Sequence, residues 1–95
     1  MNNNLKSDSM DDLFSAILSL NTIENCYDFF DDLCTIQELR AFAQRFQVAR
    51  MLSNGMVFND IVKMTGASTA TISRVNRSLN YGSGGYQSVI SGLEE

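Results

Sequence analysis

Apolar side chains recur at spacings of three and four residues along most of this chain, which is the period of an α-helix. Leu13, Ile17 and Leu20 give one example, and no segment shows the clean alternation of a half-buried strand. Short breaks with Gly or a capping residue separate the periodic segments. The pattern predicts an all-α fold with six helices.

Capping signals set the expected helix boundaries. Thr35 and Glu38 have the spacing of a capping box, Asn21 and Glu24 resemble one, and Ser68 is a candidate N-cap. The expected helices cover residues 11–20, 22–31, 35–53, 57–64, 69–79 and 86–95.

Residues 1–10 are polar and aperiodic, which predicts a flexible N-terminal tail, and residues 11–95 are expected to form a single helical domain. A chain of 95 residues buries only roughly 60–65% of its unfolded surface, so its stability alone would be modest. Oligomerisation is a common remedy for a domain of this size.

The chain contains no His, which excludes Ser/His/Asp and Cys/His catalysis. Cys26 and Cys34 stand eight residues apart and cannot complete a zinc site, so we expect neither a metal nor a catalytic residue. The longest apolar runs are too short for a membrane span or a signal peptide. We therefore expect a cytoplasmic protein with reduced cysteines and no membrane partner.

The two halves of the chain carry opposite charge. From Met1 to Glu38 there are one cation and eight anions, whereas from Leu39 to Leu93 there are six cations and one anion. The basic half is expected to face a polyanion. Alternatively, the two halves attract each other.

Residues 58–77 have the pattern of a helix-turn-helix, in which Gly66 occupies the turn. Ile61, Ile72 and Val75 fall at the positions that hold the two helices together, and Ala67 supplies the small residue after the glycine. Two positions depart from the usual frame: Val62 stands where Ala is commoner, and Thr65 stands where a larger aliphatic residue is commoner.

The opposite face of the second helix is suited to a DNA major groove, because hydroxyls, small apolar groups and arginines can contact base edges or phosphates. No acidic residue lies between Val62 and Leu93. Alternatively, this face belongs to a solvent-exposed helix that is rich in Ser and Thr and has no binding role. The candidate DNA-binding residues are Lys63, Ser68, Thr69, Ala70, Ser73, Arg74 and Arg77.

Over residues 11–93 the sequence resembles the Trp repressor family, and most closely its Trp-repressor-related, YerC/YecD-type branch. The specific features are Thr35-x-x-Glu38, Arg45, the turn at Leu52–Gly55, and the run from Gly66 to Arg74. The last stretch resembles the family's turn and recognition helix almost residue for residue.

The resemblance implies an intertwined homodimer that binds double-stranded DNA. Residues 11–53 would supply the dimerisation helices, 57–79 the helix-turn-helix and 86–95 a C-terminal helix. Two helix-turn-helix heads would read a palindromic operator, as in a transcriptional repressor.

The resemblance also implies a ligand site made by Thr35, Arg45, Arg74 and Ser78, which all carry the residue type of the tryptophan-responsive member. Val75, however, stands where that member has a Gly that makes room for the indole. We therefore expect no tight binding of tryptophan, and an unknown small-molecule co-regulator stays open. Phosphate contacts or ion pairs with the acidic helices are the alternative roles of Arg45 and Arg74.

A rival reading is a helical protein–protein interaction module with a relict helix-turn-helix. The overall acidity of the chain, with a net charge of −4, favours this reading. An enzyme is not expected, because no paired carboxylates, nucleophile–base pair or phosphate loop stands out.

Overall fold

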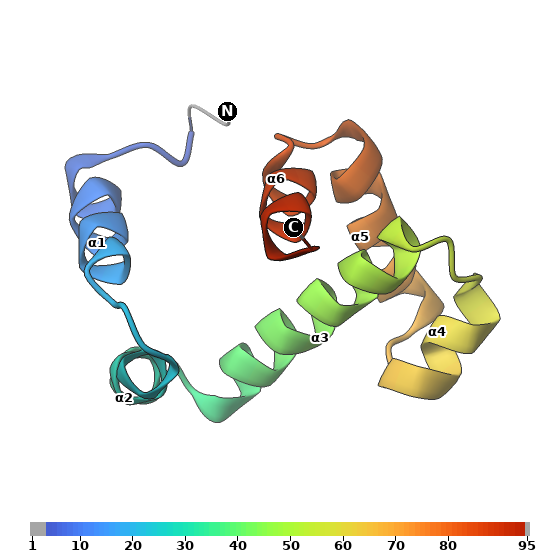
Figure 1. Ribbon diagram of the computed structural model, residues 1–95, viewed down its shortest axis with the longest axis horizontal. Helices are drawn as coiled ribbons and strands as arrows, with labels where there is room; N and C mark the ends of the chain where they lie inside the picture. The colour runs from blue at the N-terminus through green and yellow to red at the C-terminus, as the bar shows by residue number, and fades with distance from the viewer. Residues whose placement is uncertain (1–3, 95) are drawn as a thin grey trace. The chain divides into compact units, whose positions relative to one another are not determined.

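The computed structural model describes residues 4–94, and within that range it contains six α-helices and no strand. This architecture confirms the predicted all-α fold. Within the same residues, no helix is both long and apolar enough to cross a membrane. The helices are α1 (Asp8–Leu18), α2 (Ile23–Leu33), α3 (Ile36–Ser53), α4 (Phe58–Thr65), α5 (Thr69–Tyr81) and α6 (Gly85–Glu94) (Figure 1).

Helix α1 begins at Asp8, three residues before the expected start at 11, and ends at Leu18 rather than at 20. The reason is a cap that the periodicity did not reveal: the hydroxyl of Ser7 accepts a hydrogen bond from the backbone N–H of Met10 at 3.1 Å. Residues 8–10 of the predicted tail therefore belong to α1. Residues 1–3 lie outside the described part of the chain.

Helix α2 is capped by Thr22, not by Asn21 as expected, and it extends to Leu33. The Thr22 hydroxyl accepts from the N–H of Asn25 at 3.0 Å. The side-chain oxygen of Asn21 instead accepts from the side-chain amide of Asn25 at 3.2 Å. Two polar residues in succession both suit a cap, and only the backbone geometry selects between them.

The capping box at the start of α3 is confirmed. The N–H of Thr35 donates to Glu38 Oε1 at 2.9 Å, and the N–H of Glu38 donates to Thr35 Oγ1 at 3.1 Å. The hydrogen bond from the Thr35 backbone, together with that from its side chain, lowers the pKa of the Glu38 carboxyl below its ordinary value of 4.5.

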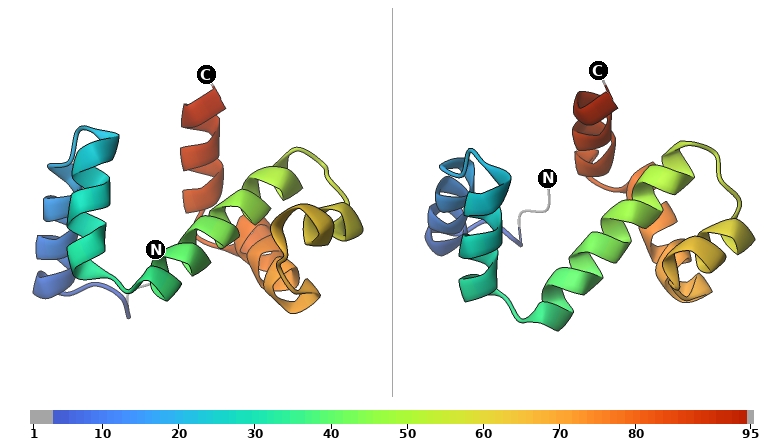
Figure 2. Two further views of the ribbon diagram at one scale, coloured as in Figure 1. Left: turned by 90° about the horizontal axis from the view of Figure 1, so that it is seen from below. Right: turned by 60° about the horizontal axis from the view of Figure 1, so that its bottom comes forward.

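The described chain separates into two compact units that divide within α3, between Leu39 and Arg40. In the second unit α4 packs on α5 and α5 on α6, and both views of Figure 2 show α4 and α5 beside the C-terminal half of α3. The buried apolar side chains all belong to this unit: Val48, Ala49, Ile61, Ala67, Ile72, Val75, Leu79 and Ile90.

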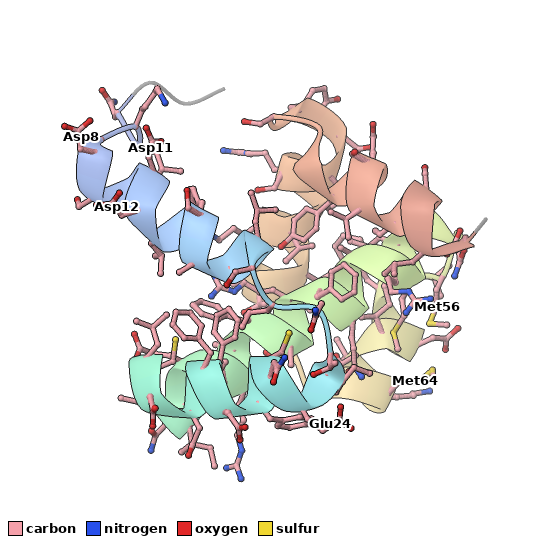
Figure 3. The ribbon with its side chains drawn as sticks, turned by 60° about the vertical axis from the view of Figure 1, so that its left-hand side comes forward. Asp8, Asp11, Asp12, Glu24, Met56 and Met64 are labelled. Carbon is pink, nitrogen blue, oxygen red and sulfur yellow. The ribbon has the colours of Figure 1, made fainter. Side chains whose placement is uncertain are left out.

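Helices α1 and α2 contain no buried residue. Large apolar side chains on and beside them are open to solvent, including Leu18 at 84%, Ile23 at 72% and Tyr27 at 75%. The first turns of both helices carry carboxylates, which the helix dipole favours at that end (Figure 3). The expectation of a single helical domain over residues 11–95 stays a prediction.

We predict that Glu38→Gln makes the protein less stable at neutral pH, and that this difference shrinks as the pH falls below about 4.5. A carboxyl with a lowered pKa in the folded state stabilises it above the pKa of the unfolded chain, and this stabilisation is lost once the folded carboxyl takes up its proton. Urea unfolding of both proteins across an acid pH series measures the difference. A difference that is independent of pH would contradict the prediction.

Candidate nucleic-acid interface

Helices α4 and α5 are joined by a tight turn at Gly66. Gly66 has a φ of 72°, in the left-handed region that favours glycine, and its N–H donates to the carbonyl of Val62 at 2.9 Å. This bond ends α4 at Thr65, and Ser68 then caps α5. Residues 58–81 therefore form a helix-turn-helix, as the sequence predicts.

The inside of this motif is apolar and closed to solvent. Ile61 and Ile72 are fully buried, and Ala67 in the turn is 2% exposed. They belong to one cluster with Val48 of α3 and Ile90 of α6, so the motif is packed on its neighbours through a shared core. The apolar positions predicted from the helix-turn-helix frame are thus in the core.

Ser68 is the N-cap of α5. Its Oγ accepts from the N–H of Thr71 at 3.1 Å, and its hydroxyl donates to Thr71 Oγ1 at 3.0 Å. The cap satisfies one of the backbone N–H groups that a helix N-terminus leaves without an intrahelical partner. Ser68 thereby fixes the first turn of α5, the part of a recognition helix that reaches base edges.

The structure places all the predicted DNA-binding residues on the surface. Because Ile72, Val75 and Leu79 are buried, the opposite side of α5 faces away from the core. Lys63 adds a cation from the last turn of α4. The exposed residues are Lys63, Ser68, Thr69, Ala70, Ser73, Arg74 and Arg77.

The exposed side of α5 is electrostatically open to an anion. Residues 4–94 contain one ion pair, which joins Lys6 Nζ to Asp11 Oδ1 at 3.2 Å. No carboxylate of the described chain therefore neutralises Arg74 or Arg77, and the first acidic residue before them is Asp60 on α4. Phosphate or base contacts are among the roles that stay open for both arginines.

Tyr81 is a residue of this side that the sequence analysis missed. It is 88% exposed and follows Ala70, Arg74 and Arg77 along one face of α5 at spacings of four, three and four. The same spacing was visible in the sequence, but a single Tyr beside Gly82 reads as part of the loop.

The predicted ligand site draws on both units, with Thr35 in the first and the other three residues in the second. Thr35 takes part in the capping box of α3, in the first unit. Arg45 donates from Nε to the carbonyl of Ala41 at 3.3 Å, and its guanidinium lies 5.1 Å from the ring centre of Phe42. Arg74 and Ser78 are exposed on α5, one turn apart. The ligand site stays a prediction.

Val75 is only 2% exposed and belongs to the central cluster. Its side chain therefore occupies the space that a glycine at this position would leave. Opening a cavity here would cost core packing, which supports the expectation that an indole ring has no room at this place.

The fold and the exposed face define a helix-turn-helix protein. The Trp repressor protein family matches residues 8–94 of this chain. The protein YerC of Bacillus subtilis (strain 168), itself uncharacterised, is 53% identical over 91 residues, which cover 96% of this chain and 88% of YerC.

Two solved structures are also similar. A TrpR-like protein from Eubacterium eligens has a TM-score of 0.95 at 55% identity, with 98% of this chain and 96% of that chain covered. A candidate Trp repressor from Staphylococcus aureus has a TM-score of 0.93 at 46% identity, with 96% and 91% covered. The chain belongs to the Trp repressor family, in its YerC-type branch, a family of DNA-binding regulators and not of enzymes.

We predict that Ser68→Ala lowers the free energy of unfolding by about 1 kcal/mol, because it removes the cap of α5. Ser68→Asp keeps an acceptor at the N-terminus of the helix and is expected to retain most of the stability. Urea unfolding measures both variants.

Ser73→Ala is the control, because Ser73 is an exposed serine of the same helix and its loss is expected to change stability by less than about 0.5 kcal/mol. An equal loss in Ser68→Ala and Ser73→Ala would show that the cap contributes nothing of its own.

Proposed function

We propose that this protein is a cytoplasmic, homodimeric transcriptional regulator of the repressor type that reads a palindromic operator through α5. The observation that carries the proposal is the division of α5 into a buried apolar side and an exposed side. The exposed side carries hydroxyls and two arginines that form no ion pair within residues 4–94. Membership of the Trp repressor family supports it.

Each exposed group has a role that its chemistry allows. Thr69, Ala70 and Ser73 can contact base edges, where the Thr and Ala methyl groups suit the methyl of thymine. Arg74 and Arg77 can form bidentate contacts with guanine or bind phosphates, and Lys63 can bind the phosphate backbone. Ser68 sets the position of this group by capping the helix.

A second copy of the chain is the proposed occupant of the apolar faces of α1 and α2. These helices bury no side chain within one chain, although Phe14, Leu18, Ile23 and Tyr27 are large and apolar. Exposed apolar surface of this kind is typical of an interface between proteins. Dimerisation would also pair two helix-turn-helix heads, as a palindrome requires.

The net charge of −4 favours the rival function, a protein–protein module with a relict helix-turn-helix. The anions, however, concentrate before Leu39 and at the C-terminus, so α5 itself is not acidic. Binding to DNA separates the two functions, because the rival predicts no affinity that depends on salt.

We predict that selection from a randomised pool of duplex DNA at low salt enriches a palindrome with half-sites about 34 Å apart. The logarithm of the affinity is expected to fall against the logarithm of the salt concentration with a slope near −0.9 for each phosphate contacted.

Arg74→Ala and Arg77→Ala should each weaken binding by about 1–3 kcal/mol if the arginine reads a base.

Lys6→Ala is the matched control, because it also removes one cation but lies outside α5, beside Asp11. Its affinity for the selected palindrome should stay close to that of the wild type. Equal affinity of the wild type and the Arg74→Ala/Arg77→Ala double variant would refute the proposed roles. No enrichment, with or without a metabolite extract, would favour the protein–protein module.

We also predict that calorimetric titration with tryptophan detects no binding in the micromolar range, because Val75 fills the place of the indole. Overpacking of an occupied site typically costs about 1–3 kcal/mol. Micromolar affinity for tryptophan would overturn this expectation, and it would make tryptophan the co-regulator.

A further inference from the structure

Thr65 is the last residue of α4, and its hydroxyl makes two hydrogen bonds that a larger aliphatic residue could not make. Its Oγ1 donates to the carbonyl of Ile61 at 2.7 Å and accepts from the N–H of Ala67 at 3.1 Å. Ala67 is 2% exposed, so its N–H needs a partner within the protein. Thr65 supplies this partner and ties the turn to the last turn of α4.

Gln44 links the end of α4 to α3. Its Nε2 donates to the backbone carbonyl of Thr65 at 3.2 Å, in a partly buried setting. This carbonyl is one of the last four of α4, which no intrahelical N–H can satisfy. The turn is therefore anchored by directional hydrogen bonds from two helices, in addition to the apolar packing of Ile61 and Ile72.

The anchored turn leads directly into the DNA-facing end of α5. Ala67 precedes the cap residue Ser68, and Thr69 and Ala70 follow on the exposed side. Apolar packing is not directional, so it permits small shifts of α5 that hydrogen bonds to base edges do not tolerate. Directional bonds at the turn remove this freedom.

We propose that Thr65 and Gln44 are positioning residues that set the placement of α5 on DNA and therefore the preference for a specific sequence. The inference rests on the proposed function and deepens it. It assigns part of the specificity to two residues whose side-chain polar atoms form hydrogen bonds within the protein. It also explains why Thr65 departs from the usual helix-turn-helix frame. Its hydroxyl holds the turn by hydrogen bonds, whereas a larger aliphatic residue at this position would hold it by packing.

The test compares affinity for the selected palindrome with affinity for an unrelated duplex of equal length across a salt series. Thr65→Val keeps the shape of the side chain and removes both hydrogen bonds, and Gln44→Leu removes the amide. Each is expected to lower the affinity for the palindrome on the order of tenfold, a loss of the size of one base contact. Affinity for the unrelated duplex should change less than about twofold, because flexible Lys and Arg side chains supply it.

Two control variants separate positioning from loss of stability. Thr65→Ser restores a hydroxyl and should return the ratio of the two affinities to within about twofold of the wild type, since its Oγ can form the same bonds. Gln87→Leu removes a similar bond, from Nε2 to the carbonyl of Leu79 at 2.9 Å, near the far end of α5. It should leave the ratio unchanged, because Leu79 lies about 16 Å along the helix from Ser68.

A measurement without DNA tests the anchored turn directly. In Thr65→Val the amide of Ala67 should exchange its hydrogen at least about tenfold faster, because it has lost its acceptor. An unchanged affinity ratio in Thr65→Val and Gln44→Leu, an equal fall in Gln87→Leu, or unchanged exchange at Ala67 would overturn the inference. If the wild type binds no duplex, the proposed function fails, and the exchange at Ala67 still decides whether Thr65 holds the turn.

Discussion

The burial of Ile61 and Ile72 in one apolar cluster is the constraint on which the helix-turn-helix depends. These two side chains join α4 to α5, and the same cluster includes Val48 of α3 and Ile90 of α6. Once this side of α5 is buried, the opposite side must face solvent, and its composition decides what the protein can bind. The exposed surface of α5 is thus set by apolar side chains that are themselves closed to solvent.

Much of this arrangement could be predicted from the sequence, because the signals are local. Helical periodicity reveals the six helices, and the capping box at Thr35 is a pattern of four residues. The start of α1 could not be predicted because residues 8–10 lack helical periodicity, and the cap of α2 could not be chosen because Asn21 and Thr22 both suit that role. Which residue becomes the N-cap depends on backbone angles that the sequence does not show.

The hydrogen bond between Gln44 and Thr65 could not be predicted, for a different reason. It joins residues 21 positions apart, and it exists only because α3 runs beside the end of α4. A glutamine on a predicted helix reads as a surface residue, and a threonine at the end of one reads as a weak packing residue. The departure of Thr65 from the frame was visible, but its cause lies in the tertiary structure.

The two bonds between Ser68 and Thr71 also limit what the Ser68 hydroxyl can offer to a ligand. The single hydroxyl proton of Ser68 is engaged with Thr71 Oγ1, so the side chain of Ser68 has only lone-pair density left to offer. Phosphate oxygens accept hydrogen bonds and cannot donate them, so they gain nothing from such a group. The amino groups of adenine and cytosine do donate, in the major groove. As long as this bond is kept, the Ser68 hydroxyl matches a hydrogen-bond donor on a base and not a phosphate oxygen.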